Sequence, residues 1–282
     1  MILFLITLMA KFSCILVSAV VGLVAPQVAA AETRYFPHAD ERYLFAHQHN
    51  GAAALLPEDV TPGTEVPLVI FLHGTNSSGE PHLWLGGGSA DLRPVALRLM
   101  KERKVRPFVV AGPSQTKRAA LARTLWDGFD LDEFVNDVVA ATQDAVRIDR
   151  RQIIVAGHSG AGCNPTGGLA TQFWTAASVT PFALASIDPC LDEEMGGAFA
   201  KRPAQIPLLV WWQSAIWPRD PDAFWAALIA GKPAERVDRL TKLPARGPNP
   251  HDAIVPLAFD NMLRELLPNE PAGRDEDVTP PT

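Results

Sequence analysis

The chain has 282 residues, of which 48% are hydrophobic and 20% are charged, and its formal net charge is −6. This length favours one or two domains, and the apolar content is sufficient for a sizeable core. A negative net charge without a basic stripe argues against a nucleic-acid partner.

The first segment of the chain has the pattern of a secretory signal. Lys11 precedes the apolar run 12–24, and three alanines follow at 29–31. A positive start, an apolar core and a small-residue cleavage site are typical of a signal peptide. We therefore predict a cleaved signal over 1–31 and a secreted or periplasmic mature chain without stable membrane insertion. An uncleaved anchor is the alternative, because the apolar stretch 1–8 lengthens the segment.

Apolar runs and helical periodicity alternate along the rest of the chain. Strands are expected at 43–46, 67–72, 106–111, 152–156, 182–187, 206–212 and 237–243. Helices are expected at 92–101, 131–146, 166–177, 221–230 and 255–267, and a turn is expected at 149–151. Strands that alternate with helices indicate an α/β fold, with a mostly parallel central sheet and helices on both faces. We predict a single domain over 32–267 and a disordered tail over 268–282, which is rich in proline and charge.

Residues 152–162 combine a buried strand with a tight turn around one serine. Gly157 and Ala161 lie two positions before and after Ser159. A serine on a sharp strand-to-helix turn is strained, and larger neighbours at these positions would collide. Such a turn exposes the serine hydroxyl and directs the backbone N–H of Gly160 toward a developing oxyanion. A glycine-rich turn of any α/β protein would show the same spacing, so the interpretation depends on other residues.

This segment resembles the nucleophile elbow of the α/β-hydrolase family. Ala161 stands where the family usually has glycine, which is a small departure because alanine is also small. The resemblance covers most of 65–267. It implies an α/β-hydrolase fold in which Ser159 is the nucleophile.

The turn after the strand 67–72 carries a second resemblance to this family. In the family a His-Gly pair follows this strand beside the nucleophile, and here the pair is His73-Gly74. The resemblance implies that a backbone N–H of this turn joins that of Gly160 as an oxyanion donor. It points to Thr75, with Gly74 as the alternative, and it makes His73 a residue that orients the turn.

A serine nucleophile needs a base that is itself oriented by an acid. In the family the partners follow in the order Ser, acid, His, and His251 is the single histidine downstream of Ser159. It lies in a polar segment that we expect to be a loop. Asp188 is the favoured acid because it ends a strand, where a carboxylate is better held than in a loop. Asp220 and Asp222 remain alternatives, and a helix N-cap is the competing role for Asp188.

Two cysteines, Cys163 and Cys190, remain once the predicted signal and its Cys14 are removed. An even pair in an oxidising compartment favours a disulfide. If the elbow interpretation holds, Cys163 lies just past the nucleophile and Cys190 lies just past the neighbouring strand. Adjacent strands are about 4.8 Å apart, which is within bridging range. Two buried free thiols are the alternative.

Together these residues predict an exported serine hydrolase that cleaves carboxylic esters through an acyl-enzyme. The expected substrate is a small-molecule or lipid-like ester. No metal or organic cofactor is expected, because the chain itself supplies the nucleophile, the base and the oxyanion donors. Amide or peptide hydrolysis by the same residues is one alternative. A non-catalytic exported binding protein is another, since a fold by itself does not establish an activity.

Overall fold

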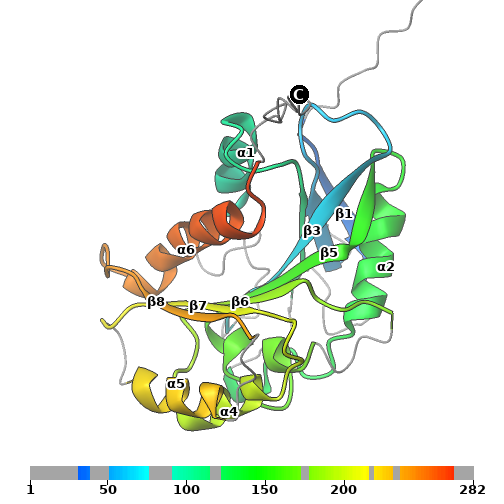
Figure 1. Cartoon of the computed structure of the whole chain (residues 1–282). Helices are drawn as coiled ribbons and strands as arrows, with labels where there is room; N and C mark the ends of the chain where they lie inside the picture. Colours follow the sequence, from blue (N-terminus) through cyan, green and yellow to red (C-terminus); the bar gives the residue numbers. More distant parts are fainter. Residues whose placement is uncertain are drawn as a thin grey trace, which may run out of the picture.

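The computed structural model describes residues 31–38, 51–75, 91–114, 122–172, 178–215, 219–230 and 236–269. Within these residues an eight-stranded sheet is covered by helices on both faces (Figure 1). The predicted signal, except its last residue, lies outside the described residues. The expected strand at 43–46 and most of the predicted tail also lie outside them.

The strands lie in the sheet in the order β1-β2-β4-β3-β5-β6-β7-β8. Their bounds are Thr33–Pro37 (β1), Gly51–Leu55 (β2), Thr64–Leu72 (β3), Val109–Pro113 (β4), Val146–His158 (β5), Ala183–Ile187 (β6), Leu208–Trp212 (β7) and Asp238–Lys242 (β8). β2 pairs antiparallel with β1 and with β4, and every other pair of these strands is parallel. The predicted α/β architecture with a mostly parallel sheet is confirmed.

The helices largely follow the predicted periodicity. Their bounds are Arg93–Lys101 (α1), Leu131–Thr142 (α2), Glu193–Ala200 (α4), Pro221–Ile229 (α5) and Pro250–Leu266 (α6), with 3-10 turns at Ala122–Thr124 (η2), Ser159–Gly162 (η3) and Gly168–Thr171 (η4). The sequence did not predict α4, which begins at its N-cap Asp192. The described part of the expected helix 166–177 contains η4 instead. Among the described residues, no helix is long and apolar enough to cross a membrane.

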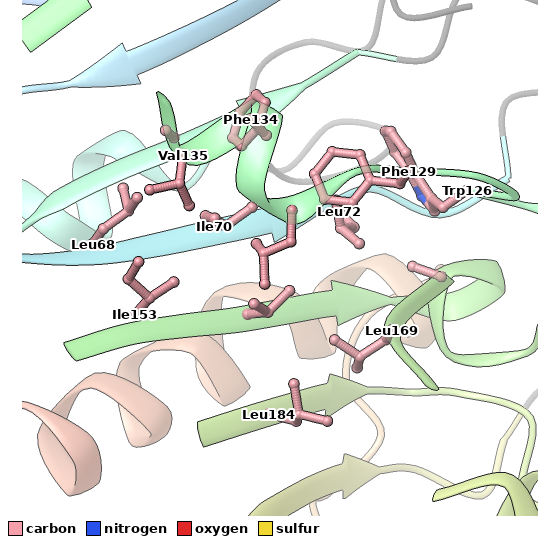
Figure 2. Packing of buried hydrophobic residues seen from close by; sticks show 14 of the residues in the cluster. Leu68, Ile70, Leu72, Trp126, Phe129, Phe134, Val135, Ile153, Leu169 and Leu184 are labelled. Carbon is pink, nitrogen blue, oxygen red and sulfur yellow. The ribbon is translucent and has the colours of Figure 1, made fainter. Parts of the chain in front are cut away.

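Side chains of β3 alternate between two cores, one on each face of the sheet. Leu68, Ile70 and Leu72 pack in the core on the α2 side (Figure 2). On the other face, Phe71 meets Phe259 of α6 edge-on, with ring centroids 6.1 Å apart. Because successive side chains of a strand point to opposite faces, a strand covered on both faces must be apolar throughout.

The turn expected at 149–151 is a bulge within β5, so that prediction is corrected. The pairing of β3 with β5 shifts between Val66, which lies opposite Ile148, and Leu68, which lies opposite Ile153. The extra residues of β5 are accommodated locally, where the Asp149 carboxylate accepts a hydrogen bond from the backbone N–H two residues on (3.0 Å). The polar sequence therefore marks an irregularity in a strand rather than its boundary.

The strand register places the ends of three strands side by side. His158, the last residue of β5, pairs with Ile187, the last residue of β6. β3 ends one residue earlier, opposite Gly157. The residues that follow directly, Ser159 and Asp188, therefore emerge from neighbouring strands at the carboxyl edge of the sheet, where open α/β sheets bind their ligands.

Close packing of α4 against α5 gives a test with a matched control. A Cβ atom at Gly196 would lie 2.2 Å from the backbone oxygen of Phe224, whereas one at Gly197 would meet nothing within 4 Å. We expect Gly196→Ala to lower the free energy of unfolding by about 1–3 kcal/mol, because the helices must separate. Gly197→Ala should raise it by about 0.5–1 kcal/mol through helix propensity. Urea unfolding followed by circular dichroism measures both, and equal effects would contradict the described packing.

Candidate active site

The turn from β5 into η3 holds Ser159 in a strained conformation. Its φ is 52°, a left-handed value that non-glycine residues rarely adopt. A Cβ at Gly157 would lie 3.0 Å from the Cβ of Ala161, and a Cβ at Gly162 would lie 2.4 Å from Ser186 Oγ. The small residues around the serine are therefore required by contact distances, as expected for a nucleophile elbow.

The turn after β3 lies directly against this serine. A Cβ at Gly74 would be 2.9 Å from the Cβ of Ser159. His73 is buried and donates from Nδ1 to the Gly74 carbonyl (2.7 Å). The His73 carbonyl in turn accepts a hydrogen bond from Trp126 Nε1 (2.9 Å). These contacts hold the turn that contains Thr75 beside the serine, while the oxyanion donors remain a prediction.

His251 lies in the first turn of α6, which corrects the expectation that it sits in a loop. Pro250 begins the helix, and the side chain of its N-cap Asn249 accepts from the backbone N–H of Asp252. The His251 side chain is 16% exposed. Its Nδ1 is 2.5 Å from Oδ2 of Asp188. The helix start thus fixes the ring while leaving it accessible.

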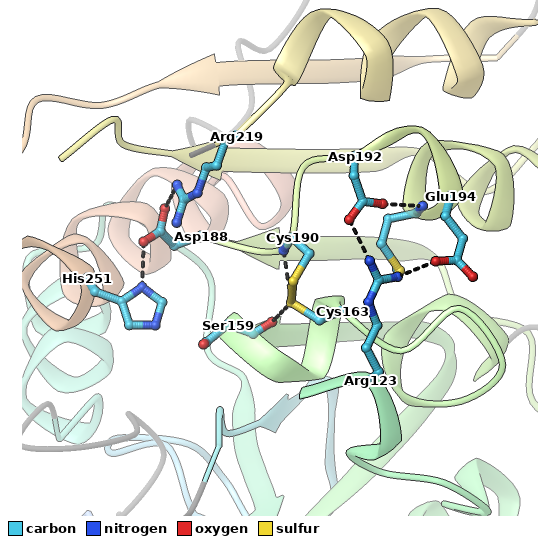
Figure 3. The surroundings of a disulfide bond; sticks show 10 residues. Arg123, Ser159, Cys163, Asp188, Cys190, Asp192, Glu194, Arg219 and His251 are labelled. Atoms are coloured by element: carbon cyan, nitrogen blue, oxygen red, sulfur yellow. Dashed lines mark hydrogen bonds and ion pairs between the residues drawn. A yellow bond between two sulfur atoms is a disulfide. The ribbon is translucent and has the colours of Figure 1, made fainter. Parts of the chain in front are cut away.

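The Asp188 carboxylate is fully buried and is hydrogen-bonded at both oxygens. Oδ2 contacts His251 and accepts from Gln213 Nε2 (2.8 Å), and Oδ1 accepts from the Gln213 backbone N–H (3.2 Å) and from Arg219 Nη1. Figure 3 shows the carboxylate between Arg219 and His251. Burial alone would raise the pKa of Asp188, but the hydrogen bonds from His251, Arg219 and Gln213 and the Arg219 charge outweigh it and lower this pKa to about 2. The carboxylate is therefore ionised at neutral pH.

The alternative acids have other roles. Asp220 is the N-cap of α5, and its side chain accepts from the backbone N–H of Ala223 (2.9 Å). Asp222 is an exposed residue of the first turn of the same helix. The N-cap role considered for Asp188 belongs to Asp192, at the start of α4. Of the three candidate acids, Asp188 is the one that contacts His251.

His158 connects the serine turn to the start of α6. Its ring lies 4.4 Å from the His251 ring, and its Nε2 donates to the His251 carbonyl (3.1 Å). In Figure 3 the Ser159 side chain points toward the His251 ring. His158, which directly precedes Ser159, therefore packs against His251, and His251 in turn contacts Asp188 at the carboxyl edge of the sheet.

Three residues of this site were not identified from the sequence. They are His158, Gln213 and Arg219. Each acts through a contact with a residue that is distant in the chain, and although His158 lies within the elbow segment, its contact with His251 leaves no mark there. The single signal for Gln213 was its position directly after a predicted strand.

Cys163 and Cys190 lie within disulfide-bonding distance, with Cα atoms 4.9 Å apart. Cys163 directly follows η3, and Cys190 lies shortly after the end of β6 (Figure 3). The pair links the serine turn to the segment that carries Asp188. Each of these two segments contains a residue with positive φ, Ser159 at 52° and Asp188 at 51°.

A cavity of about 630 Å³ lies at the opposite edge of the sheet. Its lining includes Phe182, Pro207 and Val237, the residues directly before β6, β7 and β8. In parallel strands these amino ends lie far from the carboxyl ends that carry Ser159 and Asp188. The cavity is therefore not the substrate pocket of the site described here.

Comparison with known proteins places the fold among the α/β-hydrolases. No protein-family model and no curated protein matches the sequence. Among solved structures, a ferulic acid esterase is similar over 86% of this chain and 97% of its own, at 16% identity and a TM-score of 0.51. A thermostable esterase is similar over 84% of this chain and 61% of its own, at 18% identity and a TM-score of 0.52.

A third similar structure is a fluorophosphonate-binding serine hydrolase of Staphylococcus aureus. The similarity covers 84% of this chain and 99% of that one, at 11% identity and a TM-score of 0.51. At such identities the similarity establishes the fold. The chain has an α/β-hydrolase fold, as the elbow motif predicted.

The cysteine pair can be tested by its effect on stability. We expect Cys163→Ala/Cys190→Ala to lower the free energy of unfolding by roughly 3–4 kcal/mol, because a crosslink over 27 residues restricts the unfolded chain. Denaturant unfolding measures this loss. Thiol titration of unfolded, unreduced protein should find no free thiol in the mature chain, and two free thiols would contradict the bond.

Proposed function

We propose that the chain is an exported serine hydrolase that cleaves carboxylic esters through an acyl-enzyme on Ser159. The observation that carries this proposal is the hydrogen bond between buried Asp188 and His251 Nδ1 (2.5 Å), beside a serine held at positive φ. A nucleophile, a base and an orienting acid that meet in this way can activate a hydroxyl which by itself is a poor nucleophile.

In the proposed reaction each residue has one task. Ser159 Oγ attacks the ester carbonyl while His251 Nε2 accepts its proton. Asp188 holds Nδ1–H and stabilises the imidazolium that forms. His251 then transfers the proton to the leaving alcohol, and water hydrolyses the acyl-enzyme by the same steps. The backbone N–H groups of Gly160 and Thr75 are the proposed oxyanion donors, each worth roughly 3 kcal/mol of transition-state stabilisation.

Ester hydrolysis is proposed over amide hydrolysis because the names of the similar structures include a ferulic acid esterase and a thermostable esterase. Export is supported by the signal-like segment 1–31 and by the cysteine pair. A disulfide persists in an oxidising compartment such as the periplasm or the extracellular space.

Fluorophosphonate labelling tests the nucleophile. We expect a covalent adduct on Ser159 in the folded protein, detected by peptide mass spectrometry, and no adduct in Ser159→Ala. A panel of nitrophenyl esters and aminoacyl amides then ranks the substrate classes. Turnover of amides alone would favour an amidase or peptidase. No labelling and no turnover by correctly folded protein would favour a non-catalytic binding protein.

The acid can be assigned with two matched substitutions. We expect Asp188→Asn to lower kcat for ester hydrolysis by roughly 10³–10⁴-fold, because the amide no longer holds His251 in the required tautomer. Asp220→Asn should leave kcat nearly unchanged, since asparagine is an equally good N-cap. Steady-state kinetics of both variants measures this difference, and the reverse ranking would reassign the acid.

A further inference from the structure

Arg219 forms a buried ion pair with Asp188, the proposed catalytic acid. Its side chain is 3% exposed and forms an ion pair with Asp188, whose side chain is 0% exposed. The same Nη1 also donates to the Gln213 carbonyl (2.6 Å). A cation is thus buried on the side of the carboxylate away from His251 (Figure 3).

A buried cation changes the charge that the base experiences. Asp188 alone presents a full negative charge to His251, and this favours the protonated ring. Arg219 lies against the other oxygen of the same carboxylate and opposes that effect. In the protein interior, where solvent screens charges poorly, the electrostatic interaction between two charged groups is stronger than it would be in water.

We propose that Arg219 is a positioning residue that holds the Asp188 carboxylate and offsets the negative charge that this carboxylate presents to His251. This proposal rests on the proposed function of the same site. Gln213 holds the same carboxylate without adding charge, because its backbone N–H donates to one carboxylate oxygen and its side-chain N–H donates to the other. Of these two residues, Arg219 is the one that brings a positive charge to the carboxylate.

The other titratable groups described near His251 are His158, Asp252 and His73, and an Arg219 substitution leaves all three in the chain. From β5, His158 contacts both the ring and the carbonyl of His251. On α6 itself, Asp252 is held by Asn249 (2.7 Å). From the turn after β3, His73 packs on Trp126 rather than on this ring. Because these groups remain, a difference between Arg219 variants reports the arginine charge.

Two substitutions separate charge from geometry. Arg219→Met removes the charge, and Arg219→Lys keeps it. For kcat/KM of ester hydrolysis, we expect the midpoint of the acidic limb to move up by roughly one pH unit in Arg219→Met. The reason is that uncompensated Asp188 holds the proton on the imidazole more strongly. Arg219→Lys should keep the wild-type midpoint even if its kcat is lower.

A second readout does not depend on activity. The His251 ring is titrated by NMR in wild type and in the Arg219 variants, and its signal is assigned with His251→Gln. The midpoint should move up in Arg219→Met and stay in Arg219→Lys. If Arg219→Met does not fold, Arg219→Gln replaces it, because glutamine retains a donor for Asp188 without the charge.

The outcomes distinguish the two proposals. If the midpoints of the pH profile and of the His251 titration are the same in wild type and in the uncharged variant, the proposed role of Arg219 is wrong. A loss of kcat without a change in these midpoints would mean that the contact between Arg219 and Asp188 is purely structural. If wild type has no hydrolase activity, the proposed function fails. The NMR titration still shows whether Arg219 controls the protonation of His251.

Discussion

The architecture of the proposed active site depends on one buried carboxylate. An ionised carboxylate removed from water is very unfavourable unless each of its oxygens is hydrogen-bonded. Asp188 is 0% exposed, and its partners come from the segment after β7 and from the start of α6. Satisfying this group therefore brings the ends of β6 and β7 and the first turn of α6 to one place, together with His251.

The packing around the strand ends stabilises the strained backbone conformations of the residues that follow them. Ser159 and Asp188 both have positive φ, and they follow strands that pair up to their last residues. Such conformations persist when the surrounding structure determines them. Here the support comes from the buried sheet, from the close approach of Gly74 to Ser159, and from the link between Cys163 and Cys190.

Much of the fold followed from local patterns. The apolar runs of β3, β5, β6 and β7 and the helical periodicity of α1 and α2 were predicted because burial on one or both faces leaves a pattern in the sequence. α4 was not predicted, because the pair Gly196-Gly197 is typical of a segment that breaks a helix. The structure explains Gly196 by the close packing of α4 against α5, which leaves no space for a side chain. The first part of β5 was not predicted as a strand, because the polar segment 149–151 was interpreted as a turn and a bulge resembles a turn in sequence.

The sequence by itself determined the positions that chemistry or backbone strain restricts to few residue types. These are Ser159 with its small neighbours, the single downstream histidine at 251 and the cysteine pair. The sequence favoured Asp188 over Asp220 because Asp188 ends a strand, and the tertiary structure shows that Asp188 contacts His251. Tertiary structure alone decided that Arg219 and Gln213 hold its carboxylate. The physical reason is that a buried charge is satisfied by groups that are neighbours in space. Local sequence records the strand or the cap on which such a group lies, and it does not record which distant donor reaches it.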